Sequence, residues 1–405
     1  MRIVLLSGFR IFPTNTGGHI HTACIARALA RMGHEVLLYA LAGRQADYSL
    51  RGLLGPSYHT ETIEANLTEE TNLGMGYGLT QAIARRLGFP RVWQHALMRR
   101  GIVPQRLKAA LAAADVILAD MPWCPPVPGI WRDKPWFMIS HNLEHRLLEQ
   151  GTSRHRRFAG WMRRVESDAP KNYRDIFACA EEDRDYFRAH DDGGALRLPF
   201  IRNGVDPDAY RAAGGVRQET RKNLGVSEED TLLVFAGSGF GPNLEAFEVL
   251  RAFGREHAEF LARERVYFLI LGSIQSTPWR QGAFIVTGRV PEVAPYFAAA
   301  DAGLNPVTRG SGANIKLFEY LAARLPVIST VFGVRGTPLQ PDTDFICYAP
   351  ETMREAIERY LRCRTRTQWR GFADEVWQRH RRSCDIQELM RDAVAELPEF
   401  RMKQL

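Results

Sequence analysis

Residues 305–336, NPVTRGSGANIKLFEYLAARLPVISTVFGVRG, carry the clearest structural signal in this chain. The stretch reads as a glycine-bearing loop, an amphipathic helix and a short apolar strand. Apolar side chains recur at helical spacing between Ile315 and Ala322 and are expected to face a core. Lys316 and Glu319 fall on a different stripe, one turn apart, so both are expected on one face of the helix.

The loop before this helix is suited to an anion. Residues 310–314 supply backbone N–H groups at the helix start, where unsatisfied donors and the positive end of the helix dipole favour negative charge. An anion there would lie within reach of Lys316, and Glu319 could accept hydrogen bonds from the hydroxyls of a ribose. The alternative is an ordinary Lys/Glu pair on a solvated face, worth about 0.2–0.5 kcal/mol.

Length and composition indicate a soluble globular protein of two or three domains. The chain has 405 residues, of which 45% are hydrophobic and 24% charged. No apolar run approaches the length of a membrane span, and MRIVLLSGF reads as a first strand and not as a signal peptide. The six cysteines are scattered, which favours a reducing cytoplasm over a disulfide framework or a zinc site. The net charge of +7 favours an anionic partner.

The order of apolar runs predicts two successive α/β domains with parallel sheets. A strand at residues 2–7, a helix at about 19–32 and a strand from Glu35 form a βαβ opening, with Gly17 and Gly18 at the first turn. This turn lacks G-x-G-x-x-G, which argues against a nicotinamide site. Further strands are expected at residues 115–119, 136–140, 176–180, 196–201, 231–238, 266–271, 283–287, 301–305 and 343–348.

A turn-rich segment, RNGVDPDAY, separates the two alternations near Asn203. Beyond residue 348 the chain reads as helices, with Trp369 and Trp377 as packed apolar anchors. In parallel sheets ligands bind at the carboxyl ends of the strands, so the loops after the strands are the candidate site walls.

Several motifs together resemble one family. GRVPEVAPYFAAADAGLNP, GSGANIKLFEYLAARLPVISTVFGVRG, TNTGGHIHT, RMGHEV and RNGVD occur here in its order and spacing. The chain resembles the retaining glycosyltransferases of the GT-B architecture, in particular the glycogen-synthase-like family 4 (group 1), over most of its length and most strongly over residues 234–336.

The resemblance implies an α/β GT-B fold, with two Rossmann-like domains facing across a cleft. The expected domains are an acceptor-side domain at residues 1–204, a donor domain at 205–370, and C-terminal helices at 371–405 that return to the first domain.

The resemblance also implies a donor site. The residues expected to bind the donor are Gly17, Gly18, Ser238, Arg289, Val290, Gly310, Ser311, Gly312, Ala313, Asn314, Lys316 and Glu319. Within this set, Lys316 and the loop amides would meet the diphosphate, Glu319 the ribose, and the backbone of Val290 the nucleobase. His141, Lys316 and Glu319 are the expected catalytic residues, with His141 near the transferred sugar.

The sequence departs from the family pattern at three places. Gly312 stands where a glutamate usually precedes Glu319 by seven residues, so the sugar hydroxyls must be held differently. FAGSGFGPN lacks the usual Arg and Lys after the first strand of the second domain, and Ala180 replaces a usual serine.

No metal or other cofactor is expected for the reaction. Fixed cations and helix N-terminal amides can stabilise a leaving nucleoside diphosphate without a metal ion. The acidic pairs Asp206/Asp208 and Asp342/Asp344 are interpreted as turns and not as metal ligands. His141 has its own alternative, a hydrogen-bonded structural histidine at a strand end, although Glu144 and His145 lie one turn away.

Two basic runs in the first half suggest a membrane surface. No acidic residue occurs at 81–114, where seven basic residues alternate with apolar ones, and a second run lies at 146–164. Basic helices with aromatic residues can lie on an anionic bilayer, whereas the alternative is solvated basic faces with the Trp side chains in the core.

The sequence therefore predicts a metal-independent, hexosyltransferase-type enzyme that moves a sugar from a nucleoside-diphosphate donor to a glycan or lipid-linked acceptor. Envelope polysaccharide or glycolipid synthesis is the pathway suggested by resemblance, at the cytoplasmic side of the inner membrane. The alternatives are a nucleotide-sugar epimerase of the same architecture and a basic nucleic-acid-binding protein. No nucleic-acid partner is expected, because the basic residues form no recognisable nucleic-acid module.

Overall fold

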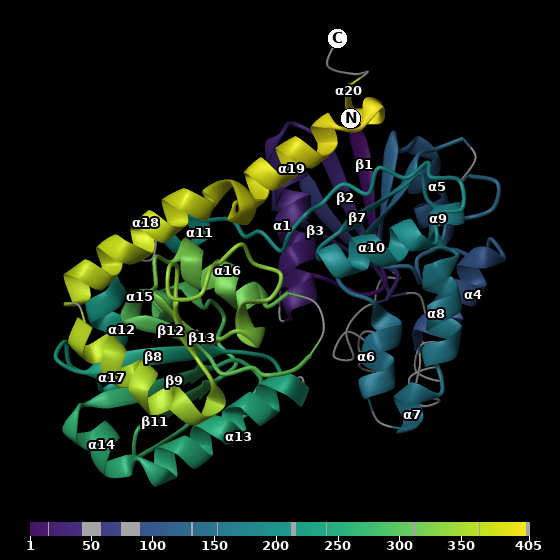
Figure 1. The fold of residues 1–405 in the computed structure, drawn as a ribbon. Helices are drawn as coiled ribbons and strands as arrows, with labels where there is room; N and C mark the ends of the chain where they lie inside the picture. Colours follow the sequence, from purple (N-terminus) through teal and green to yellow (C-terminus); the bar gives the residue numbers. More distant parts are fainter. Residues whose placement is uncertain are drawn as a thin grey trace. The chain divides into compact units, whose positions relative to one another are not determined.

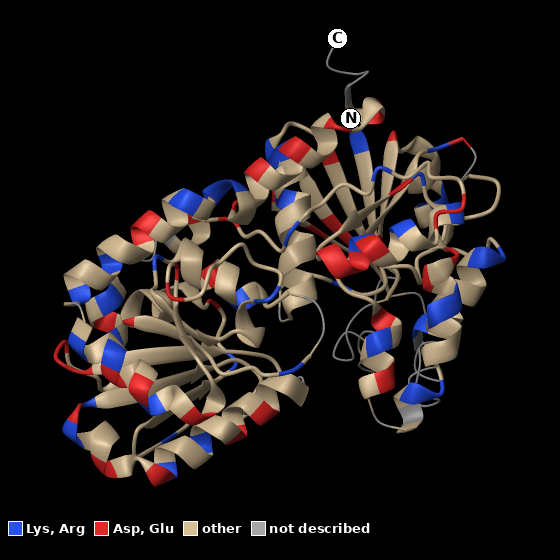
Figure 2. Ribbon diagram, in the orientation of Figure 1, with Lys and Arg blue, Asp and Glu red and all other residues tan. Residues whose placement is uncertain are grey.

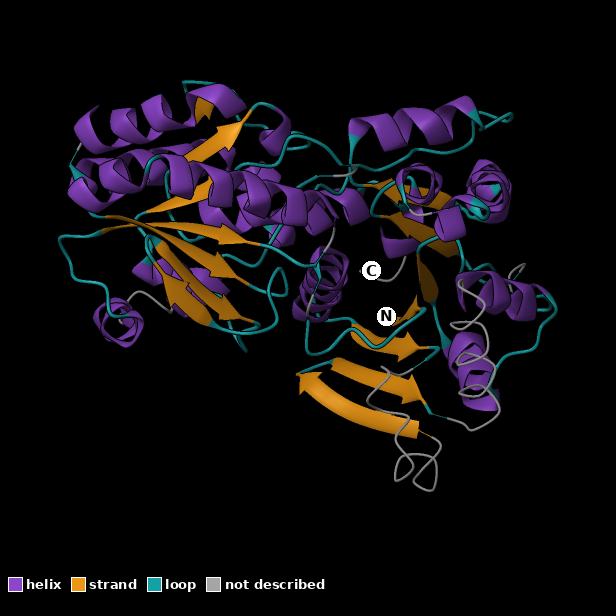
Figure 3. Ribbon diagram, turned by 90° about the horizontal axis from the view of Figure 1, so that it is seen from below, coloured by secondary structure: helices purple, strands orange, loops and turns teal. Residues whose placement is uncertain are grey.

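The computed structural model describes residues 1–14, 16–42, 58–73, 90–130, 133–151, 153–211, 216–239, 241–310, 313–363 and 365–401. The chain divides into two compact units. Unit 1 comprises Met1–Thr14, Gly18–Arg202 and Met390–Leu405, and unit 2 comprises Asn15–Gly17 and Asn203–Leu389. Each unit is built on its own sheet with helices packed against it (Figure 3).

The sheet of unit 1 has the strand order β3-β4-β2-β1-β5-β6-β7. Its strands are β1 (Arg2–Ser7), β2 (Glu35–Ala40), β3 (Tyr58–Glu64), β4 (Leu67–Asn72), β5 (Val116–Asp120), β6 (Trp136–Ser140) and β7 (Asp175–Ala178). The interior strands are continuous apolar runs such as VILAD and WFMIS, as expected for parallel strands buried on both faces.

The helices of unit 1 cover this sheet (Figure 1). They are α1 (Gly17–Arg31), α4 (Pro90–Arg99), α5 (Gln105–Ala113), α6 (Glu144–Gln150), α7 (Ser153–Arg156), α8 (Ala159–Ser167), α9 (Ala169–Asn172), α10 (Glu181–Ala189) and α20 (Pro398–Arg401). Phe400 of α20 packs on Phe137 of β6, with ring centroids 6.3 Å apart, so the end of the described chain is anchored in the core of this unit.

The sheet of unit 2 repeats the pattern, in the order β10-β11-β9-β8-β12-β13-β14. Its strands are β8 (Thr231–Ala236), β9 (Val266–Leu271), β10 (Trp279–Gln281), β11 (Phe284–Gly288), β12 (Ala302–Asn305), β13 (Val327–Thr330) and β14 (Ile346–Tyr348). Successive residues of β8 pack into different cores, Leu233 and Phe235 into one and Leu232 and Val234 into the other, because side chains alternate along a strand.

Helices therefore pack against both faces of this second sheet. They are α11 (Asp208–Arg211), α12 (Arg217–Leu224), α13 (Gly241–Glu256), α14 (Ala258–Arg263), α15 (Ala294–Ala299), α16 (Ile315–Ala322), η3 (Phe332–Val334), η4 (Pro350–Thr352), α17 (Met353–Cys363) and α18 (Arg366–Cys384), and α19 (Ile386–Ala395) follows. Trp369 and Trp377 of α18 are buried, which confirms that both are packed apolar anchors.

The prediction of a strand at residues 196–201 is wrong. Only an isolated bridge between Ala178 and Phe200 forms there. The Asp175 carboxylate accepts hydrogen bonds from the amides of Arg197 and Leu198, at 3.3 and 2.8 Å, and Leu198 has a φ of 52°. Those amides are turned toward a side chain and cannot enter a sheet ladder.

The apolar runs predicted two purely parallel sheets, but both sheets also contain an antiparallel pair of strands. β3 pairs antiparallel with β4 at one edge of the first sheet, and β10 pairs antiparallel with β11 at one edge of the second. These edge strands have mixed or polar sequences, such as YHTETIE in β3, so no apolar run marks them.

Each sheet has a topological switch point, where the chain has added strands on one side of the first strand of the unit and then continues on its other side. In unit 1 this point lies between β1 and β5, and in unit 2 between β8 and β12. Loops leave two neighbouring strands in opposite directions there, which opens a crevice at their carboxyl ends. These two positions are where a ligand site is expected.

Candidate functional site

Of the twelve predicted donor residues, eight lie either in the two loops at the switch point of unit 2 or in α16, which follows the second loop. The loop after β8 carries Ser238, and the loop after β12 runs through Gly310 to Asn314, at the start of α16. Ser311 and Gly312 lie outside the described residues. Arg289 and Val290 directly follow β11, on the same edge of the sheet.

The ends of β8, β9 and β11 are held close together by backbone contacts. The Gly272 amide donates to the Gly288 carbonyl at 2.9 Å, and a Cβ at Gly272 would lie only 2.3 Å from the Gly237 carbonyl oxygen. Gly272 also has a φ of 97°, so both its conformation and its surroundings require glycine there. Ser238 and Arg289 therefore come from adjoining loops.

Lys316 is a buried cation at this switch point. Lys316 is 6% exposed. Its ammonium nitrogen donates to Asn243 Oδ1 at 2.7 Å and lies 4.5 Å from the centroid of the Phe235 ring. Burial lowers the pKa of Lys316 to about 7, with Glu319 opposing and Arg335 reinforcing that shift. An ammonium has three N–H donors, so the bond to Asn243 leaves capacity for an anion.

Glu319 lies one turn further along α16 and is 4% exposed. Its Oε1 accepts a hydrogen bond from the Tyr210 hydroxyl at 2.8 Å, and burial raises the pKa of its carboxyl group. The interpretation of Lys316 and Glu319 as a solvated surface pair is therefore wrong. A ribose hydroxyl at Glu319 would share the carboxylate with Tyr210.

The start of α16 is organised without a side-chain cap. Asn314 is the N-cap residue, but its side chain donates to the Gly333 carbonyl at 2.7 Å and no side-chain cap bond forms. The Ala313 carbonyl accepts from Asn203 Nδ2 at 3.3 Å. The first amides of the helix are thus not consumed by a capping side chain, which suits an anion-binding helix terminus.

Two residues that were not predicted from the sequence lie next to the predicted site. Asn243, in the first turn of α13, orients the Lys316 ammonium. Arg335 lies against the loop, since a Cβ at Gly310 would be 3.2 Å from Arg335 Nη2, and its guanidinium stacks on Phe332 at 4.1 Å. Asn243 belongs to GPN and Arg335 to VRG, both within the motifs quoted from the sequence. Their sequence positions alone did not show that they would lie near Lys316.

A second polar cluster occupies the switch point of unit 1. Asp120, at the end of β5, accepts from Ser7 Oγ at 2.9 Å and from Thr22 Oγ1 at 3.1 Å. His141 follows β6, and its Nε2 lies 2.6 Å from Asp120 Oδ1. Burial alone would raise the pKa of Asp120, but the field of His141 and the hydrogen bonds with His141, Ser7 and Thr22 lower it.

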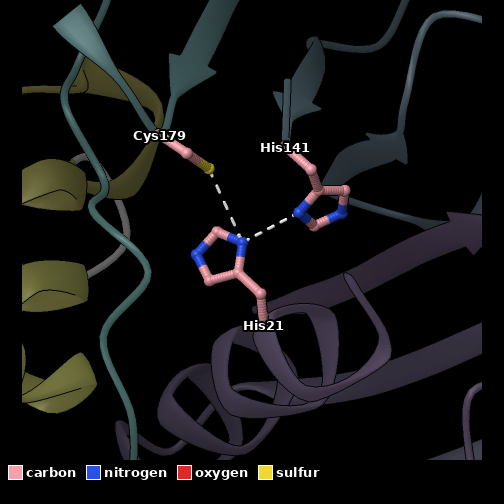
Figure 4. A group of neighbouring side chains, drawn as sticks. All are labelled: His21, His141 and Cys179. Atoms are coloured by element: carbon pink, nitrogen blue, oxygen red, sulfur yellow. Dashed lines mark hydrogen bonds between the residues drawn. The ribbon is translucent and has the colours of Figure 1, made fainter. Parts of the chain in front are cut away.

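His141 also contacts a histidine from α1. The two Nδ1 atoms of His21 and His141 lie 2.9 Å apart, and Cys179 Sγ, just after β7, lies 3.6 Å from His21 Nδ1 (Figure 4). Burial and the neighbouring His141 lower the pKa of His21 to about 3. Among the described residues, these three form the group whose ligand atoms, all within 4.8 Å of one another, could hold a metal ion.

Gly17 and Gly18 open α1 in this region. A Cβ at Gly18 would meet no atom within 4 Å, so its position is open to an approaching group. The Thr22 hydroxyl, one turn on, lies 3.0 Å from the Gly18 carbonyl oxygen and 3.1 Å from Asp120 Oδ1, and its single proton can be donated to either acceptor.

Glu144 and His145 have structural partners. The carboxylate of Glu166, on α8, accepts from the Glu144 amide at 2.6 Å, and its other oxygen lies 2.6 Å from His145 Nδ1. Glu144 itself pairs with Arg91 of α4. These contacts tie α4, α6 and α8 together and do not direct either side chain at His141.

The two acidic pairs are engaged within turns and ion pairs. Asp206 accepts from the Asp208 amide at 3.2 Å, and the Asp344 carboxylate pairs with Arg379 and lies 2.9 Å from His380 Nε2. Asp342 pairs with Arg359 and has a φ of 56°. Asp206 and Asp342 therefore lie in turns, whereas the Asp344 carboxylate is paired with basic side chains of α18.

Part of the basic surface can be followed on α4, the loop after it, and α8 (Figure 2). Arg85 and Arg86 lie outside the described residues. Trp93 is 46% and Ile102 55% exposed, and Arg100 is exposed as well. The alternative that places the Trp side chains in the core is therefore wrong for Trp93. No helix in the described part of the chain is long and apolar enough to cross a membrane.

Family models match both halves of the chain. The model described as Glycosyltransferase Family 4 matches residues 15–209, and the model described as Glycosyl transferases group 1 matches residues 230–363. The second match contains α16 and the loops around Lys316. No curated protein matches the chain significantly.

Solved structures share the fold over nearly the whole chain. Sucrose-phosphate synthase from Thermosynechococcus elongatus matches with a TM-score of 0.69 at 16% identity, covering 100% of both chains. HepE from Anabaena, in complex with UDP and glucose, matches at 0.63 and 13% identity, covering 98% of this chain and 99% of its own. WaaG, a glycosyltransferase involved in lipopolysaccharide biosynthesis, matches at 0.61 and 18%, covering 97% and 99%.

Proposed function

Because the chain belongs to the glycosyltransferases of family 4 and group 1, with the GT-B fold, we propose that it transfers a sugar from a nucleoside-diphosphate donor to a glycan or lipid-linked acceptor. We further propose that the transfer proceeds with retention and that no metal ion takes part in it. The observation that carries the donor proposal is the buried Lys316 at the start of α16, at the switch point of the second sheet.

The chemistry required is stabilisation of a leaving diphosphate. Negative charge develops on the diphosphate oxygen as the glycosidic bond to the donor breaks, and fixed cations aimed at that oxygen lower the barrier. Lys316, Arg335 and the uncapped amides of α16 supply such a field from unit 2. In this proposal Asn243 is a positioning residue, because it acts through the Lys316 ammonium.

The remaining donor contacts follow from the same arrangement. Glu319 accepts from the ribose, the backbone of Val290 meets the base, and the loop at Ser238 lies beside the diphosphate. That HepE was solved with UDP and glucose supports a nucleotide donor of this kind. In unit 1, His141 meets the transferred sugar, held in position by Asp120.

The acceptor is proposed to be lipid-linked or part of an envelope glycan. The role of WaaG in lipopolysaccharide biosynthesis supports this class, and so does the basic surface with the exposed Trp93 on α4. The proposed location is the cytoplasmic face of the inner membrane, with unit 1 in peripheral contact with anionic lipid.

A thermal-shift screen against UDP, GDP and ADP tests the donor site. A ligand at a hundred times its dissociation constant stabilises the folded state by about 2.7 kcal/mol, so a selective shift identifies the base. We expect Lys316→Met and Arg335→Met each to weaken binding by roughly 10- to 100-fold, as for a lost charge-assisted hydrogen bond.

Lys222→Met is the matched control, because Lys222 is exposed on α12. The apo melting temperature separates lost binding from lost folding: Lys316→Met removes a buried charge and should not lower it. Unchanged nucleotide shifts in both site variants would reject the assignment.

A further inference from the structure

The side chains of His21, His141 and Cys179 converge from three separate elements of unit 1. They come from α1 and from the residues directly after β6 and β7, and Figure 4 shows a ring nitrogen of His141 and the sulfur of Cys179 turned toward one ring nitrogen of His21. The separations are 2.9 Å between the two Nδ1 atoms and 3.6 Å between Cys179 Sγ and His21 Nδ1.

The nitrogen–sulfur separation matches a tetrahedral metal centre, the nitrogen–nitrogen separation is close to one, and all three ligand atoms lie within 4.8 Å of one another. With metal–nitrogen bonds of about 2.0–2.1 Å and metal–sulfur bonds of about 2.3 Å, two ligand nitrogens lie about 3.3 Å apart and a nitrogen and a sulfur about 3.6 Å apart. The nitrogen pair needs to open by only a few tenths of an ångström. Imidazole and thiolate together are a ligand set that suits Zn²⁺.

The second ring nitrogen of His141, Nε2, is held by a carboxylate. This nitrogen lies 2.6 Å from Asp120 Oδ1, and Asp120 is in turn held by Ser7 and Thr22. Metal-binding histidines commonly donate their second ring N–H to a carboxylate, which fixes the ring and strengthens the ligand nitrogen. His141 already has this arrangement, with Nδ1 facing His21 and Cys179.

We propose that His21, His141 and Cys179 form a zinc-binding site with a fourth position open to water. On binding, the thiol proton leaves to solvent and the proton of His21 shifts from Nδ1 to Nε2 of the same ring, so three lone pairs face the ion. The site shares His141 with the proposed transfer reaction, although no metal is proposed for the transfer itself. Occupation would hold His141 and block transfer, a consequence that rests on the proposed function.

Cobalt titration of the chelator-treated protein tests the metal site directly. Co²⁺ replaces Zn²⁺ in tetrahedral sites and gives visible d–d bands and a near-ultraviolet thiolate band. We expect one equivalent to bind, Zn²⁺ to displace it, Cys179→Ala to lose the thiolate band, and Asp120→Asn to weaken binding by about 10- to 100-fold.

Cys124→Ala is the matched control, since Cys124 is a buried free cysteine of the same unit outside the cluster. Circular dichroism melting of each variant verifies that it is folded. Absence of the bands in the parent protein, or their persistence in Cys179→Ala, overturns the proposal, as does an equal loss in Cys124→Ala.

Zinc inhibition of transfer tests the consequence separately. Each variant is compared with its own chelated rate, and Cys179→Ala should require more than about tenfold higher Zn²⁺ for half-inhibition. If cobalt binds but zinc leaves the rate unchanged, the metal site stands and the place of His141 beside the sugar is rejected. If no transfer is found with any donor, the spectroscopic result still decides the metal site.

Discussion

The ammonium of Lys316 lies in an environment that makes donor binding depend on pH. Burial lowers the pKa of Lys316 to about 7, and a bound diphosphate would raise it again by supplying the missing negative charge. Above pH 7 the free site is increasingly neutral, so binding must take up a proton. The affinity for a nucleoside diphosphate is therefore expected to fall by up to about tenfold per pH unit above pH 7.

Calorimetry at pH 8 in two buffers of different ionisation enthalpy measures this uptake. At that pH a terminal phosphate, with a second pKa near 6, is already ionised and does not contribute. Lys316→Met should abolish the uptake and Lys222→Met should leave it intact. Equal binding enthalpies in both buffers for the parent protein would contradict the prediction.

Asp183, at the start of α10, is expected to make stability depend on pH in another way. It is 3% exposed, and burial, with Glu182 and Glu166 adding to it, raises its pKa to about 7 against the opposing fields of Arg146 and His141. The folded state therefore keeps a proton that the unfolded state loses near pH 4. The stability associated with this proton is present below pH 4 and is lost as the pH rises to 7.

Asp183→Asn mimics the protonated carboxyl group at every pH. It should raise the free energy of unfolding at pH 8 by a few kcal/mol, on the order of the pKa shift, with no gain at pH 4. Urea denaturation at the two pH values measures the difference. Asp185→Asn, exposed on the same helix, is the control, and an equal effect at both pH values would refute the assignment.

At the scale of elements, Glu166 holds α6 and α8 together. Its buried carboxylate accepts both the Glu144 amide and the His145 amide at the start of α6, at 2.6 and 3.3 Å, and contacts the His145 ring. Glu166→Ala would leave two buried amides at a helix N-terminus without partners. The expected cost is about 3–5 kcal/mol of unfolding free energy.

Guanidinium denaturation monitored by far-ultraviolet circular dichroism measures this cost. Glu149→Ala, on the exposed side of α6 where its carboxylate pairs with Arg163, should cost less than about 1 kcal/mol. A similar loss in both variants would mean that Glu166 acts through general packing and not as the cap of α6.

The elements that the sequence predicts well are those with a continuous apolar run. β1, β8 and β9 begin where expected because parallel strands buried on both faces need apolar side chains at every position. β3 was not predicted, since its sequence YHTETIE lies at a sheet edge with most side chains exposed. The prediction of a strand at Leu196–Ile201 was wrong because two amides of this segment donate to the carboxylate of Asp175, about twenty residues away in the chain.

The same limit applies to the candidate site. Helical spacing alone placed Lys316 and Glu319 together, and the strand end placed His141. Their burial could not be predicted, because the covering groups Asn243 and Tyr210 come from other elements. A partner that is remote in sequence becomes visible only when the order of strands is known.

At the scale of the whole molecule, the net charge of +7 and the exposed apolar residues on unit 1 predict binding to an anionic bilayer. Trp93 on α4 and Ile102 just after it are exposed, and so is Arg100 between them in the sequence. A tryptophan at the interface adds apolar contact, and each basic residue near an anionic surface adds about 1 kcal/mol.

Sedimentation with vesicles of phosphatidylglycerol and phosphatidylcholine, against phosphatidylcholine alone, measures this binding. We expect Arg100→Gln to weaken it by about fivefold and the double variant with Trp93→Ser to weaken it further, with the arginine effect shrinking at high salt. Arg255→Gln, a change of equal charge on α13 of unit 2, should have little effect if unit 1 carries the contact. Equal losses in Arg100→Gln and Arg255→Gln would mean that net charge alone drives association, and binding that is independent of both salt and anionic lipid would exclude an electrostatic surface.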